Sequence, residues 1–349
     1  MNNSLVGEGV TMQQATIPDS ATSRLSRNHL NDILQRVGLY DDMLRVEQEL
    51  VARIESRSAM LRAAGMYTVQ SGGKRLRVML VLLAARLATY QFERAKHPAV
   101  AIELLHAASL VHDDLVDHAG SRRGRATVHM TWNRDVALAL GDFLFGLAAR
   151  ELADEPDPRI IGFYVYAARC MVEGELNPVT VVEPRDQAEA QYFRKIGYKT
   201  AVLFEAACRS GIAVAGGSDA AVEALGQFGY ELGLAFQIID DILDMVESES
   251  VLGKPAGNDL REGTITLPLI LAAAVDSSEV LRLAVSGQVA PERVPEVIAR
   301  IQAVGGIDAA YNVAHDCIVR GLACLAPYAA NESYEAFVAI TNHVLQRRY

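Results

Sequence analysis

The sequence predicts an all-α fold, a large single-domain helical bundle. Half of the 349 residues are hydrophobic, one is Trp and 11 are Pro, and this is the composition of a helical protein with a sizeable core. Apolar residues also recur at spacings of three and four, as in Leu30, Ile33, Leu34 and Val37, which is the period of an amphipathic helix. The bundle is expected to occupy residues 26–349, with a disordered, polar leader over residues 1–25.

The predicted helices can be placed in chain order. Helical spacing runs from residue 26 to about residue 54. A glycine-rich turn at residues 71–77 then precedes an apolar helix over residues 78–87. Further helices are expected over residues 131–152, 160–176 and 220–246, and another starts at residue 187. Pro156 and Pro158 separate the first two of these because proline cannot continue a helix.

Charge and cysteine usage exclude several classes of protein. A net charge of −10 argues against nucleic acid or an anionic membrane surface as the partner. No apolar run reaches the 18 residues of a spanning helix, and the N-terminus has no basic and apolar signal segment. Four cysteines without a CxxC pair indicate reduced core thiols and a cytoplasmic location; they are Cys170, Cys208, Cys317 and Cys324.

An acidic pair marks the first candidate site. Asp113 and Asp117 stand four residues apart in an apolar run, so on a helix their carboxylates share one face and repel each other. Hard oxygen ligands without nearby cysteine favour Mg²⁺, which usually bridges one or two carboxylates to substrate phosphates. Arg122 and Arg123 follow, and two guanidinium groups could each grip a phosphate oxygen. Taken alone, this pattern is more often a solvated acidic helix end.

A second copy of the pattern strengthens the interpretation. Asp240 and Asp244 again stand four residues apart on an apolar helix, and Lys254 follows them as the arginines follow the first pair. Two acidic faces, each trailed by cations, can bracket one polyanion.

With these motifs the chain resembles the trans-prenyltransferases, the isoprenyl diphosphate synthases of the polyprenyl synthetase family, over roughly residues 26 to 349. The two DDxxD motifs of that family match residues 113–117 and 240–244. The resemblance implies the isoprenoid synthase type of bundle around a central cavity, and a homodimer. It also implies metal ligation by Asp113, Asp117, Asp240 and Asp244, with three Mg²⁺ ions for which Mn²⁺ is a substitute.

The glycine-rich turn is a candidate anion site. Glycines opening a helix leave backbone N–H groups at its positive end, and Lys74 and Arg77 add side-chain charge. In the family the matching GGKxxR motif holds the diphosphate of isopentenyl diphosphate, and the resemblance adds His106 and Arg123 to this site. A solvated basic turn and a satisfied core histidine are the alternatives.

The allylic diphosphate is implied to bind elsewhere. The resemblance assigns it to Arg122, Lys199, Lys254 and the metals, with Thr200 and Gln237 beside them, and a helix break at Lys199 turns backbone oxygens toward the developing cation. A snorkelling surface lysine is the alternative for Lys199. Residues 253–268 resemble the family's loop motif GKxxGxDLxxGKxTLP, but Thr264 replaces its second lysine. The chain also departs from the family pattern where Asn177 and Pro178 follow the segment 173–175.

The implied reaction is Mg²⁺-dependent condensation of isopentenyl diphosphate with an allylic diphosphate, by ionisation, C–C bond formation and loss of a proton. The resemblance gives catalytic roles to Asp113, Asp117, Lys199 and Asp240. One helical turn, about 5.4 Å, covers roughly one isoprene unit. The small Ala108 and Ser109, and Leu105 one turn deeper, therefore predict a product of about C30 to C50 by turn counting.

Other functions stay open at this stage. A short-chain geranylgeranyl or farnesyl diphosphate synthase is the runner-up, and a catalytic subunit that needs a second synthase subunit is another alternative. A terpene cyclase is disfavoured because such enzymes typically lack the GGKxxR segment. A regulatory subunit is disfavoured because both aspartate clusters are complete.

Overall fold

The structure is a computed structural model that describes residues 34–153, 155–180, 183–246 and 256–346. The predicted leader at residues 1–25 and the candidate Lys254 lie outside the described residues. The all-α prediction is confirmed, because the described chain is helical apart from loops and one short hairpin. In this described part no helix is both long and apolar enough to cross a membrane.

The elements follow one another along the chain with short connections. The helices of the first half are α2 (Tyr40–Arg53), α3 (Ala59–Val69), α4 (Leu76–Arg86), α5 (Phe92–Val116), α6 (Val128–Thr131), α7 (Arg134–Ala153) and α8 (Pro158–Glu175), and the hairpin strands are β1 (Ser121–Arg122) and β2 (Arg125–Ala126). The second half contains α9 (Arg185–Ile196), the π-helix η1 (Gly197–Ala201), α10 (Val202–Val214), α11 (Asp219–Val246), α13 (Asn258–Arg261), α14 (Leu267–Ala273), α15 (Glu279–Val285), the 3₁₀ turn η2 (Pro291–Arg293), α16 (Val294–Ala303), α17 (Gly306–Cys324), the 3₁₀ turn η3 (Ala326–Tyr328) and α18 (Glu332–Gln346).

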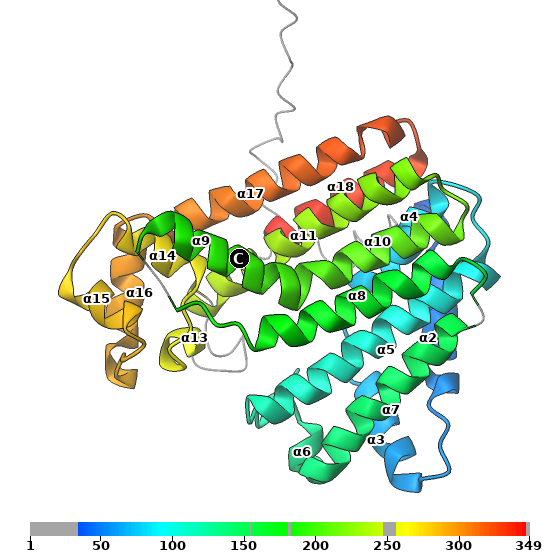
Figure 1. Ribbon diagram of the computed structural model, residues 1–349, viewed down its shortest axis with the longest axis horizontal. Coiled ribbons are helices and arrows are strands. Elements are labelled where there is room, and N and C mark those ends of the chain that lie inside the picture. Colours follow the sequence, from blue (N-terminus) through cyan, green and yellow to red (C-terminus); the bar gives the residue numbers. More distant parts are fainter. Residues whose placement is uncertain (1–33, 154, 181–182, 247–255, 347–349) are drawn as a thin grey trace, which may run out of the picture.

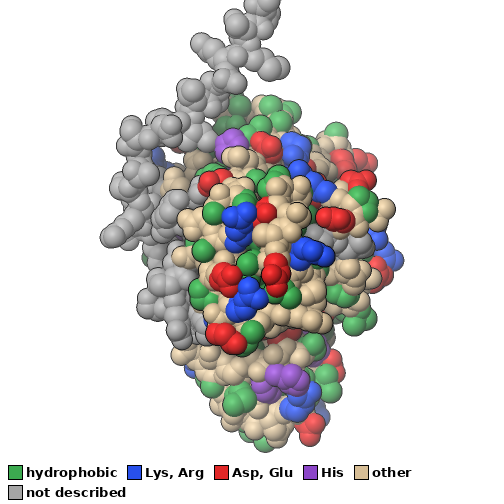
Figure 2. All heavy atoms as spheres, turned by 90° about the vertical axis from the view of Figure 1, so that its left-hand side faces the viewer, with side chains coloured by type: hydrophobic (Ala, Val, Ile, Leu, Met, Phe, Trp, Pro, Cys, Tyr) green, Lys and Arg blue, Asp and Glu red, His purple; other side chains and the backbone are tan. Residues whose placement is uncertain are grey.

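The long helices form a bundle with α10 near its centre (Figure 1). Helix α10 packs against α4, α5, α8 and α11, and α11 packs in turn against α17. Helix α7 covers the other side of α5. The shorter helices α9, α13, α14, α15 and α16 gather at the left-hand end of the bundle (Figure 1). Figure 2 shows the molecule from that end, where acidic and basic side chains of the described residues are interspersed on the surface.

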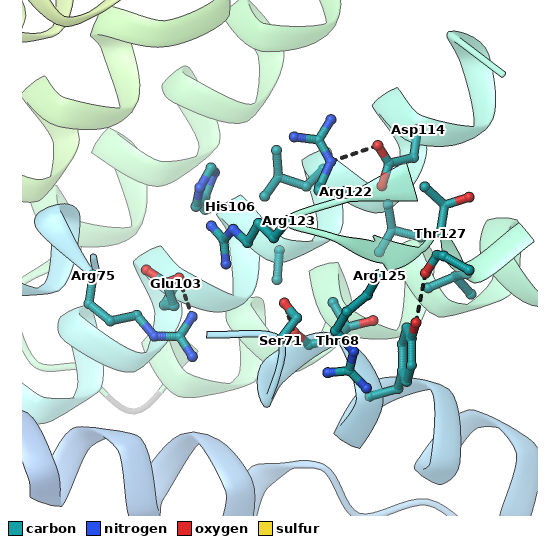
Figure 3. Close-up of a pocket in the computed structure, with 16 residues that line it drawn as sticks. Thr68, Ser71, Arg75, Glu103, His106, Asp114, Arg122, Arg123, Arg125 and Thr127 are labelled. Atoms are coloured by element: carbon teal, nitrogen blue, oxygen red, sulfur yellow. Dashed lines mark hydrogen bonds and ion pairs between the residues drawn. The ribbon is translucent and has the colours of Figure 1, made fainter. Parts of the chain in front are cut away.

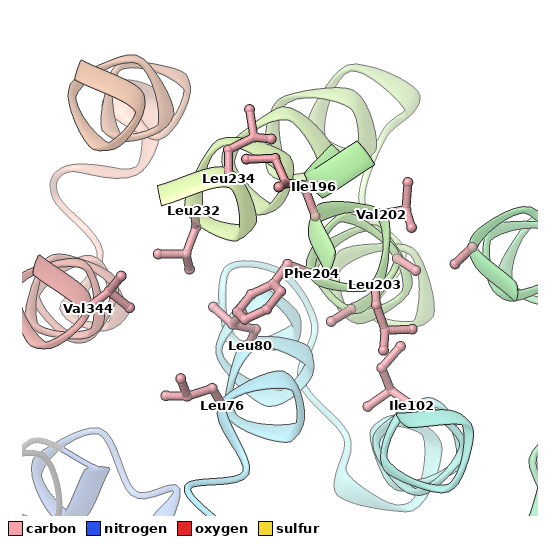
Figure 4. Packing of buried hydrophobic residues seen from close by; sticks show 14 of the residues in the cluster. Leu76, Leu80, Ile102, Ile196, Val202, Leu203, Phe204, Leu232, Leu234 and Val344 are labelled. Atoms are coloured by element: carbon pink, nitrogen blue, oxygen red, sulfur yellow. The ribbon is translucent and has the colours of Figure 1, made fainter. Parts of the chain in front are cut away.

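The core explains why the central helices can lie so close together. Phe204 of α10 is fully buried next to Leu80 of α4, and Ile102 of α5 packs nearby (Figure 4). A Cβ atom at Gly211 would lie 2.2 Å from the carbonyl oxygen of Val81, so only glycine permits this approach of α10 to α4. Removing a buried aromatic side chain such as Phe204 typically costs about 3 to 5 kcal/mol.

Two local features differ from the sequence prediction. The helix expected over residues 131–152 corresponds to α7 but begins at Arg134, after the separate short helix α6, because the Asn133 side chain accepts the N–H of Val136 at 2.9 Å and caps the new helix. The arginines after Asp117 lie in a β-hairpin and not in a plain loop. Its two-residue turn, Arg123 and Gly124, has positive φ at both positions, which matches the twist of paired strands.

Candidate active site

A cavity of about 240 Å³ lies where the ends of α5, α8 and α9 meet α11. It brings together four of the predicted residues, Asp117, Lys199, Thr200 and Gln237, whereas Asp113, Asp240 and Asp244 are not among its lining residues. Its walls carry five acidic side chains and two lysines. These are Asp117, Glu175, Asp241, Asp259 and Glu262, with Lys195 and Lys199. Thr200, Gln237 and the two departures from the family pattern, Thr264 and Pro178, also line it. We call this the acidic cavity.

The first aspartate cluster lies at the C-terminal end of α5. Asp117 is exposed at the helix cap, whereas Asp113 is half-buried one turn earlier. Burial raises the pKa of Asp113 to about 6, and the nearby carboxylates of Glu175 and Asp117 add to the shift while Lys199 opposes it. A bound cation would relieve this repulsion.

The middle aspartate of this cluster has a different partner. Asp114 is buried, and its Oδ1 accepts a 2.6 Å hydrogen bond from Nε of Arg122 (Figure 3). Arg122, expected to contact a phosphate, is therefore oriented by Asp114 before any substrate binds. Its remaining N–H groups can still donate to a diphosphate because a guanidinium carries five.

The second aspartate cluster repeats this division of roles. The middle aspartate, Asp241, accepts hydrogen bonds from the Tyr192 hydroxyl at 2.6 Å and from Nε2 of Gln237 at 2.9 Å. The Thr200 hydroxyl donates to Oε1 of Gln237 at 2.7 Å, which fixes the orientation of the amide. Burial raises the pKa of Asp241 to about 8, and the charge of Asp259 adds to it.

The outer aspartates of this cluster differ in burial. Asp240 is half-buried, whereas Asp244 is buried and its Oδ2 accepts the backbone N–H of Asp259 at 3.0 Å. The carbonyl oxygen of Asp244 also accepts the N–H of Gly257 at 2.6 Å. Asp244, predicted only as a metal ligand, thus also holds the loop that follows residue 256.

Lys199 lies on a break in the helix, as the resemblance implied. The π-helix η1 inserts between α9 and α10, and Lys199 extends from it to an ion pair of 2.5 Å with Glu175. Burial alone would lower the pKa of Lys199, but Glu175 and Asp113 raise it overall. The backbone of η1 lies close to α8 here: a Cβ atom added at Gly174 would lie 2.9 Å from the backbone nitrogen of Lys199. Sequence reasoning noted the segment around Glu175 but missed this pairing.

A second, basic pocket of about 50 Å³ lies beside the hairpin (Figure 3). Its lining has four arginines against two carboxylates and one histidine; these are Arg75, Arg122, Arg123 and Arg125, with Glu103, Asp114 and His106. Arg123 lies beside His106 and reaches the carbonyl oxygen of Gly72 in the glycine-rich turn. We call this the arginine pocket.

His106 is part of this pocket and not an isolated core residue. Nη1 of Arg77 lies 3.2 Å from Nε2 of His106. Arginine can only donate, so Nε2 is the acceptor and the proton is on Nδ1. Burial and the charge of Arg77 hold the pKa of His106 well below its usual value, which keeps the ring neutral. Burial also lowers the pKa of Arg77 to about 10, and its guanidinium stacks 4.5 Å from the centre of the Phe204 ring.

Arg75, which sequence reasoning did not single out, anchors the glycine-rich turn. It donates to the buried carboxylate of Glu103 at 2.6 Å, to Glu47 of α2 at 2.6 Å and to the carbonyl oxygen of Val69 at 2.7 Å. Its φ of 48° is the left-handed conformation that non-glycine residues rarely adopt. Lys74, the preceding residue, is exposed and lies near α18.

The candidate metal ligands of the two aspartate clusters are all carboxylates. Among the described residues, no three His, Cys, Asp or Glu side chains converge on one point. Pairs of carboxylates on two helices, all with oxygen donors, fit a hard divalent cation that takes its other ligands from substrate phosphates and water.

The predicted chain-length residues lie on the buried part of α5. Ala108 and Leu105 are buried, and the Ser109 hydroxyl donates to the carbonyl oxygen of His106. Further down the same helix, the hydroxyl of Tyr164 from α8 donates to the carbonyl oxygen of Pro98 at 2.6 Å. This polar bridge lies about 22 Å below Asp113 along α5, at 1.5 Å per residue.

Several known proteins are similar to this chain in sequence and in fold. The family model described as Polyprenyl synthetase matches residues 58–301. The chain is 37% identical over 314 residues to heptaprenyl diphosphate synthase component 2 of Geobacillus stearothermophilus, covering 89% of this chain and 97% of that protein. It is 33% identical to octaprenyl diphosphate synthase of Haemophilus influenzae, covering 88% and 94%. A polyprenyl synthase from Caulobacter crescentus CB15, solved with calcium and isoprenyl diphosphate, superposes with a TM-score of 0.84 at 34% identity, covering 91% and 98%.

Proposed function

The chain belongs to the polyprenyl synthetase family, and from this premise we propose that it elongates a trans-polyprenyl diphosphate by condensing isopentenyl diphosphate with an allylic diphosphate. It is thus a prenyltransferase. The observation that carries the proposal is that two pockets lie along one helix, one lined mainly by acidic side chains and the other mainly by arginines. The acidic cavity begins at Asp117 of α5, and the arginine pocket begins at Glu103 and His106 of the same helix.

The acidic cavity would bind the allylic diphosphate. Asp113, Asp117, Asp240 and Asp244 would hold divalent cations, three Mg²⁺ ions with Mn²⁺ as a substitute. The cations would neutralise charge on the departing diphosphate. Lys199 would donate to the same oxygens. Its ion pair with Glu175 keeps it charged and directed into the cavity.

The arginine pocket would bind isopentenyl diphosphate without a metal. Arg77 and Arg123 supply permanent charge, and neutral His106 can donate from Nδ1. Arg122 and its partner Asp114 both line this pocket, although the resemblance assigned Arg122 to the allylic diphosphate. Substrates bound in these sites would bring the double bond of one to the allylic carbon of the other.

The reaction requires cleavage of the allylic C–O bond, formation of a C–C bond and loss of one proton, which we assign to the released diphosphate. The π-helix η1 shifts the backbone hydrogen-bond pattern beside Lys199, and a carbonyl oxygen released by that shift would face the allylic carbon. Such an oxygen can stabilise the allylic cation without reacting with it. The apolar walls of the bundle would exclude water from the cation.

The product length can be estimated from the floor of the bundle. A product channel beside α5 would pass Ala108, which is small, and Leu105, which lies only about two turns below Asp113. The bridge between Tyr164 and Pro98 lies about four turns below Asp113 and would close the channel. In the family, a block one turn below the first aspartate cluster stops growth at about C15, and each further turn adds one isoprene unit, so four turns correspond to about C30. This is the lower end of the C30 to C50 range, and the heptaprenyl and octaprenyl synthases among the relatives support a medium or long product over a C20 one.

The oligomeric partner is proposed from an exposed apolar face. Three residues of α8, the residue that caps its C-terminal end and one residue of α7 are large, apolar and exposed; they are Ile161, Val165, Val172, Leu176 and Leu138. A second copy of the chain would cover this face and give a homodimer. A heteromeric synthase is the alternative, because the relative from Geobacillus stearothermophilus is named as component 2.

Incubation of the purified chain alone with Mg²⁺, labelled isopentenyl diphosphate and farnesyl diphosphate tests this function, with sizing of the dephosphorylated products. A ladder ending at one length is the expected result. Absence of elongation with every allylic primer, also after addition of a second subunit from cell extract, would contradict the proposal.

The proposed floor has its own test. Tyr164→Ala should shift the end of the ladder to longer products, because it removes the polar bridge and opens space below Leu105. Tyr328→Phe in the turn η3, which belongs neither to α5 nor to α8, should leave the length unchanged. An unaltered ladder for Tyr164→Ala would place the floor elsewhere.

A further inference from the structure

We propose that His343, on the last helix of the described chain, is a positioning residue of the isopentenyl diphosphate site that acts through Lys74. The proposal rests on the function proposed above and on the role that the family resemblance implies for Lys74, contact with that diphosphate. It concerns a residue from a part of the sequence in which no motif pointed to the site.

The contact joins opposite ends of the sequence. Nζ of Lys74 lies 3.0 Å from Nε2 of His343, although the two residues are 269 positions apart. A charged lysine can only donate, so Nε2 accepts and the imidazole is neutral with its proton on Nδ1. His343 therefore binds Lys74 without adding a charge of its own.

The position of His343 is fixed by its neighbours on α18. Ile340, Val344 and Leu345 are buried, and α18 packs against α4 and α11. Figure 4 shows Val344 directed into the core, in the part of the bundle where Leu76 begins α4. His343 is thus carried by a rigid element that lies next to the helix following the glycine-rich turn.

This anchor complements the one made by Arg75. Arg75 holds the turn from the inside through Glu103 and Glu47. Lys74 points the other way and is exposed, with a long side chain that loses much rotational freedom when it binds a ligand. A contact that already restricts Lys74 reduces this cost, so the diphosphate binds more tightly to the arranged site.

The expected effect is on substrate affinity and not on the chemical step. His343→Ala should raise KM for isopentenyl diphosphate by roughly two- to tenfold, the range for losing the prior ordering of one long side chain. It should leave kcat and KM for the allylic diphosphate unchanged. His343→Gln should restore most of the affinity, because the Gln carbonyl oxygen can accept from Lys74 in place of Nε2.

The matched control is His315→Ala. His315 is a half-exposed histidine of α17 that lies beside Asp316 and is away from both sites. Its loss should change none of these constants, and thermal melting of all variants shows whether any effect reflects unfolding.

A binding measurement separates this inference from the proposed function. Inorganic pyrophosphate is titrated calorimetrically in the presence of a chelator, which leaves only the metal-independent arginine pocket to bind it. His343→Ala and Lys74→Ala should each weaken binding, and the double variant should bind no more weakly than Lys74→Ala. Equal affinity of wild type and His343→Ala, or additive losses in the double variant, would overturn the inference. A wild-type chain that binds pyrophosphate in this way but condenses no substrates would instead refute the proposed function.

Discussion

In our proposal the acidic cavity and the arginine pocket bind the same chemical group, a diphosphate, although their lining side chains carry opposite charge. The first presents five carboxylates and two lysines, so it repels a diphosphate until cations are added. The second presents four arginines against two carboxylates and needs no added cation. The difference separates the diphosphate that must leave from the one that must stay. A metal can stabilise a developing leaving group, whereas fixed guanidinium groups only hold a substrate.

Both sites also contain a carboxylate that binds protein instead of ligand. Asp114 orients Arg122, Asp241 accepts from Tyr192 and Gln237, and Glu103 pairs with Arg75. These buried acids keep their partners in place when no substrate is bound. Their loss would therefore disturb geometry, whereas loss of an outer aspartate would remove a ligand.

Removal of metal is expected to have the largest effect and to divide the two sites. A chelator should abolish turnover and binding of the allylic diphosphate, because the acidic cavity then repels it. Binding of isopentenyl diphosphate should persist, as measured by calorimetry. Equal loss of both ligands would mean that the arginine pocket is not an independent site.

Substitution of the outer aspartates should have the second largest effect on turnover. Asp113→Ala and Asp240→Ala should each lower kcat by roughly 10²- to 10³-fold, the usual cost of removing one group that stabilises charge in the transition state. Steady-state kinetics at saturating Mg²⁺ measures the change. Asp316→Ala, an exposed aspartate of α17, is the matched control. Unchanged turnover of either variant would refute the assignment of catalysis to this cavity.

Substitution in the arginine pocket should have a smaller effect, of another kind. Arg123→Gln should raise KM for isopentenyl diphosphate by roughly tenfold or more, since a charge-assisted hydrogen bond contributes about 1.5 to 3 kcal/mol. The metal requirement should not change. Arg293→Gln, in an exposed pair with Glu296, serves as control. A changed metal dependence in Arg123→Gln would show that the two sites are not separate.

A pH dependence should also distinguish the sites. Asp113 must lose its proton to bind a cation, and its pKa of about 6 lies above the ordinary 3.8. Affinity of the substrate-free chain for Mn²⁺ should therefore fall by up to about tenfold per pH unit below pH 6 and level off above it. In the arginine pocket neutral His106 and charged Arg77 keep their states over this range. Titration of Mn²⁺ against Asp113→Asn, which should lose the dependence on Asp113, is the check.

The raised pKa of Asp113 also determines how its contribution to the stability of the fold changes with pH. Because the pKa of Asp113 is higher in the fold than in the unfolded chain, the stabilising contribution of its protonated form is complete below pH 3.8 and is lost as the pH rises through about 6. The metal-free protein should melt at a higher temperature relative to Asp113→Asn at low pH than at neutral pH. A difference in melting temperature that is independent of pH would contradict the raised pKa.

The sequence by itself determined the helical fold and the existence of the two aspartate clusters. The helix expected over residues 220–246 runs from Asp219 to Val246 in the structure, because its apolar period is long and uninterrupted. The acidic pairs could be recognised because helical spacing alone places both carboxylates on one face. The short hairpin was not expected, since strands of two residues leave no periodic signal.

Only the tertiary structure decided which groups meet. Lys199 pairs with Glu175, Arg75 with Glu103, and Lys74 with His343, and each pair joins segments that are separate in the sequence. Sequence spacing is informative within one helix because the backbone fixes the geometry from residue to residue. It carries no distance between helices, since that distance depends on how the whole core packs. The raised pKa of Asp113 has the same origin, because burial is a property of the assembled bundle.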